Sequence, residues 1–396
     1  MNLILIDDEK KWLNLLPLTY TRPVSEIRIG ILTIREKWEK HLKTKASYGC
    51  KNYLRLKFPT VFKKNTNNYF INSNVIPDAK LVAAIKKLKP KEGLNKDNVF
   101  IAFCSDNSEI TSSEVINNCK EYNENIFSIN NVWDIFQKNG EALKADFDLL
   151  TKGKKSQALS KSNTVVGNKK LIFIEKGAKI EASTFNTSGG PIYIGKNAEV
   201  MEGALIRGPF SLGEESVLKL GAKVYGPTTI GVHCKVGGEV SNSVIFGYSN
   251  KAHDGFIGNT VIGEWCNLGA DTNTSNLKNN YGSIKLFNYE SNGSKDTGLQ
   301  FCGLIMGDHC KCGINTMFNT GTVAGVGANI FGGGFPPTHI PSFVWGGAEG
   351  FDTYRLEKMF ETTQRVYARR NMTLESVEKK ILEIIFSETT KFREWE

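Results

Sequence analysis

His253 is the residue of this 396-residue chain whose type and setting best suit acid–base chemistry. An imidazole changes charge near neutral pH, so it can take a proton from an attacking nucleophile and return it to a leaving group. His253 lies in the segment Asn250–Gly258, where a six-residue repeat loses its register. We therefore expect it on a loop or at a corner between strands. The alternative is a structural histidine that hydrogen bonds hold in place.

Acidic side chains after two apolar stretches form a second candidate group. Asp7 and Asp8 follow the stretch Asn2–Ile6, and Asp106 follows Val99–Cys104. Carboxylates suit Mg²⁺, which would serve phosphate chemistry. Single acids at strand ends also commonly cap helices or face solvent. The metal content is therefore left open by the sequence.

An apolar residue recurs at every sixth position along the middle of the chain. The run is Ile194, Val200, Ile206, Leu212, Leu218, Val224, Ile230 and Val236. A period of six fits neither an amphipathic helix nor a single strand, and it is typical of a parallel β-helix. The pattern returns at Phe256 and from Met306 to Ile330, with interruptions at about 242–255 and 274–303. The elements that position His253 are therefore predicted to be coils of a β-helix.

The flanking segments have other patterns. Residues 1–150 alternate strand-like and helix-like stretches and predict an α/β domain. We expect strands at Asn2–Ile6 and Val99–Cys104 and a helix at Ile31–Leu42. Residues 151–168 predict a linker, residues 169–346 the β-helix, and residues 347–396 a helical tail with a second helix around Val377–Ile385.

Composition narrows the class of protein. The net charge is +9, but aromatic residues are not interleaved with the lysine runs, which disfavours a nucleic-acid partner. No apolar run approaches the roughly 20 residues that span a bilayer. The eight cysteines are scattered and several occupy repeat positions, so we expect reduced core thiols in a cytoplasmic protein. His309–Cys312 is interpreted as part of that core, because no second ligand pair lies at zinc spacing.

Two stretches resemble known enzymes. Leu16–Pro23, followed by Ile29–Ile34, resembles the opening of sugar-phosphate nucleotidyltransferases. Asn250–Gly258, followed by Val261–Ala270, resembles the acetyltransferase half of the bifunctional N-acetylglucosamine-1-phosphate uridyltransferase/glucosamine-1-phosphate acetyltransferase family. The similarity is greatest to a short, divergent branch with a reduced nucleotidyltransferase-like first domain. It implies a left-handed β-helix, a homotrimer, and acetyl-CoA bound between neighbouring subunits.

The resemblance also implies roles for individual residues. His253 takes the place of the catalytic histidine, Asn267 and Asn276 match positions that hold the amino sugar, and Ala270 matches a position that lines the site through its backbone. Lys251 is a basic residue nearby that could bind the substrate. The family's tyrosine is Phe256 here, and the cations that bind the sugar phosphate on earlier coils have no clear counterpart. The identity of the acceptor is therefore left open.

The nucleotidyl site departs further from the family. Such sites hold a triphosphate on a glycine-rich turn after the first strand. Here acids follow that strand and no glycine precedes Gly30, although Arg22 matches a nucleotide-binding arginine. We expect a weakened or lost uridylyltransferase activity, with Mg²⁺ as its cofactor if it persists.

Three functions follow, in order of preference. The first is an acetyl-CoA-dependent N-acetyltransferase that acts on an amino sugar phosphate or nucleotide sugar in UDP-N-acetylglucosamine and cell-envelope precursor metabolism. The second is nucleotidyl transfer from UTP to N-acetylglucosamine 1-phosphate by the N-terminal domain. The third is a non-catalytic oligomerisation module that binds a nucleotide sugar. The presence of His253 within its motif favours an enzyme. The replacement of the family's tyrosine by Phe256 favours the non-catalytic binding module.

Overall fold

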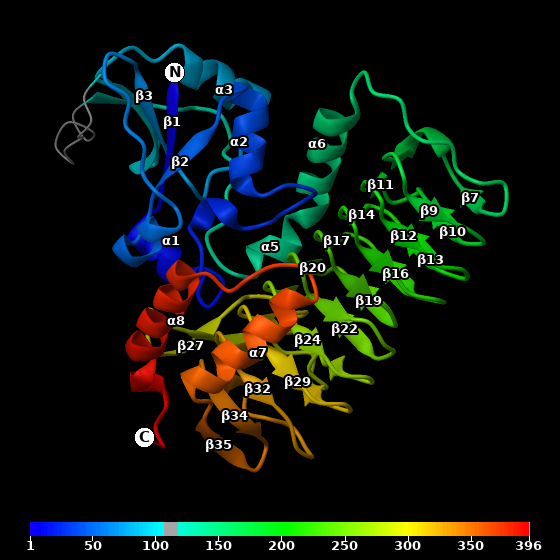
Figure 1. Cartoon of the computed structure of the whole chain (residues 1–396). Coiled ribbons are helices and arrows are strands. Elements are labelled where there is room, and N and C mark those ends of the chain that lie inside the picture. The colour runs from blue at the N-terminus through cyan, green and yellow to red at the C-terminus, as the bar shows by residue number, and fades with distance from the viewer. Residues whose placement is uncertain (107–117, 396) are drawn as a thin grey trace. The chain divides into compact units, whose positions relative to one another are not determined.

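The computed structural model of the chain describes residues 1–106 and 118–395. The chain folds into two compact units, which are described separately. The first unit comprises residues 1–15, 21–27 and 32–131, and the second comprises residues 16–20, 28–31 and 132–396. The predicted order of an α/β segment, a parallel β-solenoid and C-terminal helices is confirmed (Figure 1). The predicted domain limits stay a prediction.

The first unit is built on a six-stranded mixed sheet in the order β2-β1-β3-β5-β4-β6. Its strands are β1 (Asn2–Ile6), β2 (Ala46–Gly49), β3 (Asn68–Asn72), β4 (Glu92–Lys96), β5 (Val99–Ser105) and β6 (Cys119–Glu121). Its helices are α1 (Glu9–Asn14), α2 (Ile34–Leu42) and α3 (Ala79–Lys86), with short 3₁₀ turns at Val24–Glu26 and Asn52–Leu56. The expected strands at Asn2–Ile6 and Val99–Cys104 are confirmed.

Helix α2 begins three residues later than the predicted helix. Thr33 accepts a hydrogen bond from the Glu36 backbone, and the Glu36 carboxylate accepts one from the Thr33 backbone. This capping box satisfies backbone donors that the first turn leaves open, so the helix starts at Ile34. The apolar residues before Thr33 belong to the chain segment that leads into the helix.

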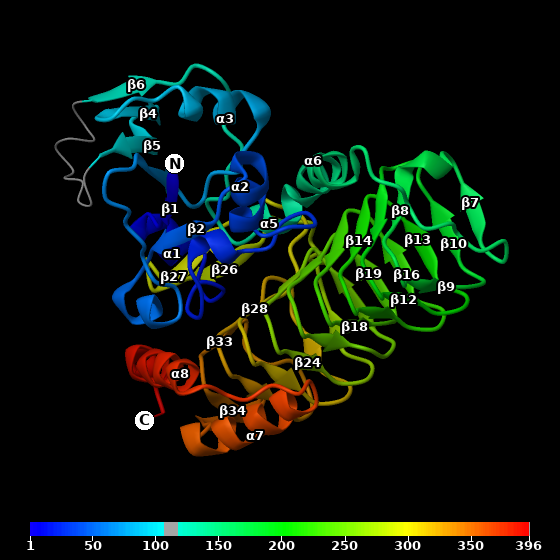
Figure 2. The same cartoon turned by 45° about the horizontal axis from the view of Figure 1, so that its top comes forward.

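The solenoid in the second unit has three parallel sheets, which Figure 2 shows edge-on as a stack of coils. The six-stranded solenoid sheet holds β7 (Thr164–Val166), β10 (Thr184–Asn186), β13 (Leu205–Arg207), β16 (Lys223–Tyr225), β19 (Glu239–Ser241) and β22 (Phe256–Gly258). The nine-stranded sheet holds β8 (Ile172–Ile174), β11 (Ile192–Ile194), β14 (Phe210–Leu212), β17 (Thr228–Ile230), β20 (Val244–Ile245), β23 (Val261–Ile262), β28 (Ile305–Met306), β31 (Val323–Ala324) and β33 (His339–Ile340).

The ten-stranded sheet completes the prism. It holds β9 (Lys179–Ile180), β12 (Glu199–Val200), β15 (Val217–Leu218), β18 (Lys235–Val236), β21 (Asn250–Lys251), β24 (Asn267–Leu268), β29 (Lys311–Cys312), β32 (Asn329–Ile330), β34 (Val344–Gly347) and β35 (Gly350–Thr353). The last pair, β34 and β35, is antiparallel and closes the parallel edge. A two-stranded pair, β25 (Asn273–Thr274) with β30 (Met317–Phe318), lies outside these sheets.

The six-residue repeat places one inward side chain on each of the three sheets in turn. Ile194, Val200 and Ile206 lie on successive strands of different sheets, and eighteen residues later the same three sheets receive Leu212, Leu218 and Val224. These side chains are at most 2% exposed and belong to one apolar core. The prediction that this ladder is the core of a β-helix is therefore confirmed.

The two predicted interruptions have different structural causes. Across the first, the coils continue but become shorter, because Lys235 pairs with Asn250 and Asn250 pairs with Asn267. Across the second, Asn267 pairs with Lys311, so the intervening chain leaves the solenoid. That excursion contains an antiparallel hairpin of β26 (Lys285–Asn288) and β27 (Gly293–Asp296).

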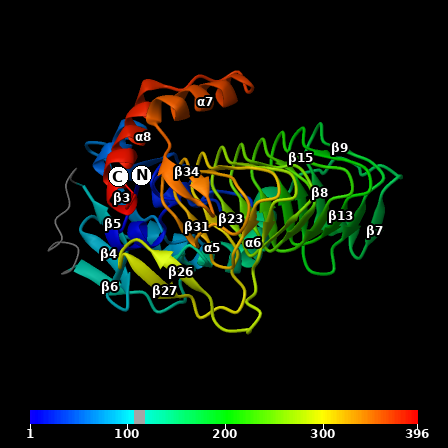
Figure 3. The same cartoon turned by 90° about the horizontal axis from the view of Figure 1, so that it is seen from below.

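Helices flank the solenoid. Before it come α5 (Asp134–Gln137) and α6 (Asn139–Thr151), a short 3₁₀ turn (Lys169–Leu171) lies between β7 and β8, and after the solenoid come α7 (Leu356–Ala368), α8 (Ser376–Glu388) and a 3₁₀ turn (Thr390–Phe392). Figure 3 shows α7 running along the outside of the coils. The Tyr367 ring of α7 packs against the Trp265 ring at an interplanar angle of 34°, with ring centroids 4.1 Å apart. The predicted helical tail is thereby confirmed.

Candidate functional site

His253 lies on the corner that joins β21 to β22, between the ten-stranded sheet and the six-stranded solenoid sheet. Its side chain is exposed, as the sequence predicts for a residue outside the repeat register. Gly255 is needed at this corner, because its φ is +110° and a Cβ atom there would lie 2.2 Å from the Thr272 carbonyl oxygen. The next coil therefore packs directly against the corner.

Lys251 holds the same corner from inside the solenoid. It pairs with Val236 on the inward side of β21 and is 1% exposed. Its ammonium donates hydrogen bonds to the carbonyl oxygens of His253 and Asp254, the latter at 2.8 Å. Burial lowers the pKa of this ammonium to about 8. Lys251 therefore faces the loop backbone from within, whereas the sequence suggested a contact with substrate.

The neighbouring coil brings Ala270 beside the His253 corner. The Asp271 backbone N–H donates to the Asp254 carbonyl oxygen at 3.1 Å, so the corner that carries Ala270 stacks on the corner that carries His253. Asn267 lies on β24, one strand above Asn250, and its side chain is exposed on the outer face of the ten-stranded sheet. These residues come from adjacent coils and lie on one side of the prism.

Asn276 lies at a different corner. Its amide donates to the Asn259 side-chain oxygen at 2.8 Å, and Asn259 follows the far end of β22. The three residues of β22 span about 10 Å, so Asn276 is separated from the His253 corner by the width of a sheet. Phe256 lies on β22 between the two corners, and its backbone N–H donates to the Asn273 side chain. Within one chain, His253 and Ala270 are brought together and Asn276 is not.

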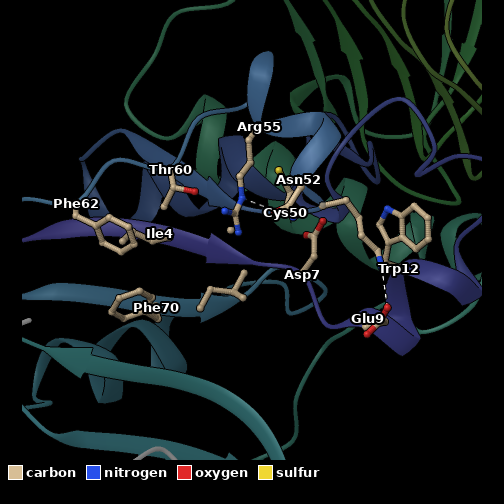
Figure 4. A pocket seen from close by; sticks show the side chains of 13 residues that line it. Ile4, Asp7, Glu9, Trp12, Cys50, Asn52, Arg55, Thr60, Phe62 and Phe70 are labelled. Carbon is tan, nitrogen blue, oxygen red and sulfur yellow. Dashed lines mark hydrogen bonds and ion pairs between the residues drawn. The ribbon is translucent and has the colours of Figure 1, made fainter. Parts of the chain in front are cut away.

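A second candidate place is a cavity of about 480 Å³ at the end of β1 in the first unit. Figure 4 shows Asp7, Trp12 and Arg55 gathered around it. The Asp7 carboxylate accepts hydrogen bonds from the Val24 backbone at 3.1 Å and from the Ser73 hydroxyl. Desolvation raises the pKa of this carboxyl to about 7, so Asp7 carries a proton for part of the time at neutral pH.

Basic groups also line this cavity. The Arg55 side chain donates to the Cys50 carbonyl oxygen at 3.3 Å, and the Lys51 ammonium pairs with Glu9 at 2.7 Å. The same ammonium lies 4.7 Å from the centre of the Trp12 ring. No sequence motif pointed to Arg55 or Lys51, because they come from a 3₁₀ turn and its cap. The predicted Arg22 is 5% exposed and does not line the cavity.

Within residues 1–106 and 118–395, the acids that the sequence suggested for Mg²⁺ are not gathered into a metal centre. The Asp7 carboxylate already accepts hydrogen bonds from Val24 and Ser73. The Asp8 carboxylate accepts a hydrogen bond from the Lys11 backbone N–H and so caps α1. Asp106 follows β5 and is exposed. Over residues 1–106 and 118–395, no three His, Cys, Asp or Glu side chains are grouped so as to hold a metal ion. In the same residues, no helix is long and apolar enough to cross a membrane.

Comparison with known proteins supports the resemblance seen in the sequence. Residues 3–155 match a family model described as sugar nucleotidyl transferase. The chain is 34% identical over 87 residues to the bifunctional protein GlmU of Methanocaldococcus jannaschii and 33% identical over 95 residues to that of Methanococcus aeolicus. These alignments cover 22% and 23% of this chain, and 21% and 22% of the relatives' own lengths. The similarity to the GlmU-like family is thus confirmed.

A comparison of structures gives a weaker likeness. Arabidopsis UDP-N-acetylglucosamine acyltransferase aligns with 60% of this chain and 92% of its own chain, at 17% identity and a TM-score of 0.23. At that score the alignment adds nothing to the strand pairing described above. The assignment of a parallel solenoid therefore depends on the strand registers observed in this chain.

Proposed function

We propose that the solenoid is an acetyl-CoA-dependent N-acetyltransferase that acts on an amino sugar phosphate or nucleotide sugar, within UDP-N-acetylglucosamine metabolism. One observation carries the proposal: the exposed His253 sits on a corner whose two carbonyl groups are fixed by the buried Lys251 ammonium. A base held on a rigid corner meets the positional demand of general-base catalysis. The similarity to GlmU relatives supports the same class of reaction.

In this mechanism the substrate amine attacks the thioester carbonyl carbon. His253 accepts the proton that the amine nitrogen loses as the new C–N bond forms. The C–S bond then breaks, and the proton passes to the departing thiolate sulfur, which leaves as a thiol. Ala270, on the adjacent corner, would line the site through its backbone, and Asn267 would orient the sugar by donating and accepting hydrogen bonds.

The proposed site includes a second copy of the chain. Asn276 lies a sheet's width from His253 in one chain, so a compact amino sugar phosphate would contact both residues if a neighbouring solenoid supplied one of them. We propose a homotrimer for this reason. Light scattering coupled to size-exclusion chromatography measures the assembly directly. A monomer that retains full acetyl transfer would contradict the shared site.

Acetyl-CoA turnover with a panel of amino-sugar phosphates tests the assignment of the base. We expect His253→Ala to lower kcat by a factor of about 10² or more, the usual contribution of a general base. His41→Ala, in α2 of the first unit, is the matched control and should leave turnover unchanged. Equal activity in His253→Ala and the parent protein would remove His253 from the mechanism.

Nucleotidyl transfer is the second candidate, because residues 3–155 match the sugar nucleotidyl transferase family model. The cavity beside Asp7 is the place where such an activity would reside, with Arg55 and Lys51 as the basic residues that line it. Pyrophosphate release from UTP, N-acetylglucosamine 1-phosphate and Mg²⁺ measures it. Release that Arg55→Gln abolishes would support the second function, and no release with any sugar phosphate would exclude it.

The third candidate, a non-catalytic module, makes a different prediction. Such a module has no need to bind an acyl donor, so titration calorimetry with acetyl-CoA separates it from the acetyltransferase. Binding accompanied by turnover excludes the module.

A further inference from the structure

A cavity of about 680 Å³ lies at the first coil of the solenoid, within the second unit. Its walls come from α6, from residues 154–163 and from the chain that runs from β7 to β8. The strands β7 and β22 are at opposite ends of the six-stranded solenoid sheet, five strand spacings or about 24 Å apart, so the cavity is remote from the His253 corner. Its volume falls in the range of small-molecule sites.

Apolar side chains face this cavity because the solenoid begins here. The inward side chains of a middle coil are covered by the coils on either side, whereas the first coil has a neighbouring coil on one side only. Leu159 and Val165 pack against the core at this end and are only partly buried. The apolar residues that line the cavity are Phe147, Leu159, Val165, Ile172, Phe173 and Ile174.

Polar side chains from the segment before β7 close the open edge of the first coil. The Gln157 amide donates to the Ala178 carbonyl oxygen at 2.8 Å and accepts from the Gly177 backbone N–H at 2.9 Å. The Asn163 amide donates to the Ile180 carbonyl oxygen at 3.0 Å. These bonds satisfy edge groups that a preceding coil would otherwise pair with, and they hold the wall of the cavity in place.

The other uncharged polar groups of the lining are also engaged with the chain itself. The Thr151 hydroxyl donates to the Phe147 carbonyl oxygen at 2.7 Å, and the Ser156 hydroxyl accepts from the Ile174 backbone N–H at 2.9 Å. The Ser160 hydroxyl donates at 2.7 Å to a carboxylate outside the lining, that of Glu181. A sugar or a nucleobase is recognised by donors and acceptors. This lining instead offers apolar surface and charge.

Four lysines supply that charge from two sides of the cavity. Lys154 and Lys161 come from the segment before β7, and Lys169 and Lys170 come from the 3₁₀ turn before β8. No residue of the lining is acidic, and within residues 1–106 and 118–395 none of the four ammonium groups forms an ion pair. Charges of one sign beside apolar walls create a positive potential that attracts an anion.

We propose that this cavity binds an amphipathic anion, namely a single hydrocarbon chain with a carboxylate or phosphate head group. The chain would lie against Phe147, Leu159 and Ile172, where its apolar surface leaves water, and the head group would lie among the lysines. Because the edge hydrogen bonds fix the wall without a ligand, binding would need little ordering of the protein. The site involves neither His253 nor the cavity beside Asp7, so this binding is independent of acetyl transfer.

Titration calorimetry of the full chain at low salt tests the proposal with probes that share a ten-carbon chain. They are decanoate, decyl phosphate and 1-decanol, each used below the concentration at which it self-associates, and inorganic phosphate is the probe without a chain. We expect at least one of the two anions to bind saturably, with one molecule per chain. Decanol and inorganic phosphate should bind at least about tenfold more weakly, because each lacks one of the two kinds of contact. A preference between the anions identifies the ligand as a fatty acid or a lipid phosphate.

A pair of lysine substitutions tests the role of charge. Lys161→Gln/Lys169→Gln removes one ammonium group from each side of the cavity. Lys176→Gln/Lys179→Gln is the matched control, because both lysines are exposed on the first coil and neither lines the cavity. We expect the first pair to weaken anion binding at least about fivefold and to leave 1-decanol binding unchanged, and the control to change neither.

A larger side chain tests the role of the cavity itself. Val165→Trp places the new ring at the lining, and Val166→Trp is its control, because Val166 follows on the same strand, is 48% exposed and does not line the cavity. We expect Val165→Trp to abolish binding of all three ten-carbon probes and Val166→Trp to retain it. Thermal unfolding checks that both variants fold, and Leu159→Trp takes the place of a Val165→Trp protein that does not.

Three results would overturn the proposal. They are absence of saturable anion binding, equal affinity in Lys161→Gln/Lys169→Gln and the parent protein, and binding that survives in a folded variant with the cavity filled. Inorganic phosphate that binds as tightly as decyl phosphate would overturn it as well, because the hydrocarbon chain would then contribute nothing. His253→Ala should leave the affinity for both anions unchanged, whether or not the parent protein transfers acetyl groups.

Discussion

Lys251 occupies a position that its neighbours along the ladder fill with apolar side chains. Val236 precedes it and Leu268 follows it on the inward side of the ten-stranded sheet. A buried ammonium costs free energy unless hydrogen bonds offset the lost hydration. Here the offset comes from two carbonyl groups of the His253 corner. A polar residue inside the core is thus tied to the shape of the candidate site.

The lowered pKa of Lys251 gives a pH-dependent prediction. Between about pH 8, the folded value, and 10.5, the ordinary value, the unfolded chain binds more protons than the folded chain, so this group raises stability as pH rises. Lys251→Met removes that effect. We expect the free energy of unfolding of the parent minus that of the variant to be constant below pH 8. Between pH 8 and 10.5 this difference should rise in favour of the parent by up to about 3 kcal/mol.

Urea unfolding at a series of pH values measures this difference. Lys235→Met, on the outward side of the adjacent strand, controls for the removal of one lysine from the same sheet. A difference that stays flat from pH 7 to 10.5 would show that the Lys251 ammonium is not desolvated in the folded protein.

The coil is the element on which the candidate site depends, and its core could be predicted from the sequence. Six-residue spacing identified one inward residue on each successive strand from Ile194 to Val236, because neighbouring strands of the three sheets follow one another at six-residue intervals. The spacing could not show that the coils continue across residues 242–255. There the corners shorten, so pairing is kept while the sequence period is lost.

The close stacking of the coils also leaves no room for a side chain at some corner glycines. A Cβ atom at Gly213 would lie 2.5 Å from the carbonyl carbon and oxygen of Gly231, on the coil above. The contact is with backbone, which cannot rotate away. We expect Gly213→Ala to destabilise the protein by about 2 kcal/mol or more, in the range of overpacked cores.

Thermal unfolding provides the measurement for this substitution. Gly333→Ala is the matched control, because nothing lies within 4 Å of a Cβ atom there and its backbone does not need glycine. It should change stability by no more than about 0.5 kcal/mol. Equal effects of the two substitutions would contradict the close approach of the coils at Gly213.

At the scale of the whole molecule, the parts of the site that the sequence did not reveal are those assembled from distant segments. A groove in the second unit is lined by Lys235 and Lys311 of the ten-stranded sheet and by Arg369 and Arg370, which follow α7. No spacing rule connects Arg369 with Lys235, so only the folded chain brings them together. The cavity beside Asp7 is similar, because Arg55 reaches it from a turn without a motif.

The cysteines offer a test of the molecule as a whole. All eight are free, and seven of them are buried. Burial raises the pKa of the Cys119 thiol, the one that is partly exposed, so even this residue is a slow nucleophile. We expect a thiol reagent such as DTNB to modify at most one cysteine quickly in the folded protein and eight after denaturation without reductant. Fewer than eight after denaturation would indicate a disulfide.

The excursion between Asn267 and Lys311 shows that height along the solenoid is counted in strands and not in residues. A chain segment of 44 residues advances the stack by one strand spacing, the same rise as a coil of fifteen. The hairpin of β26 and β27 ends in exposed residues at 290–292. A foreign domain inserted at that tip would leave every rung of the ladder at its own level, which makes the hairpin a natural place to graft a reporter onto this protein.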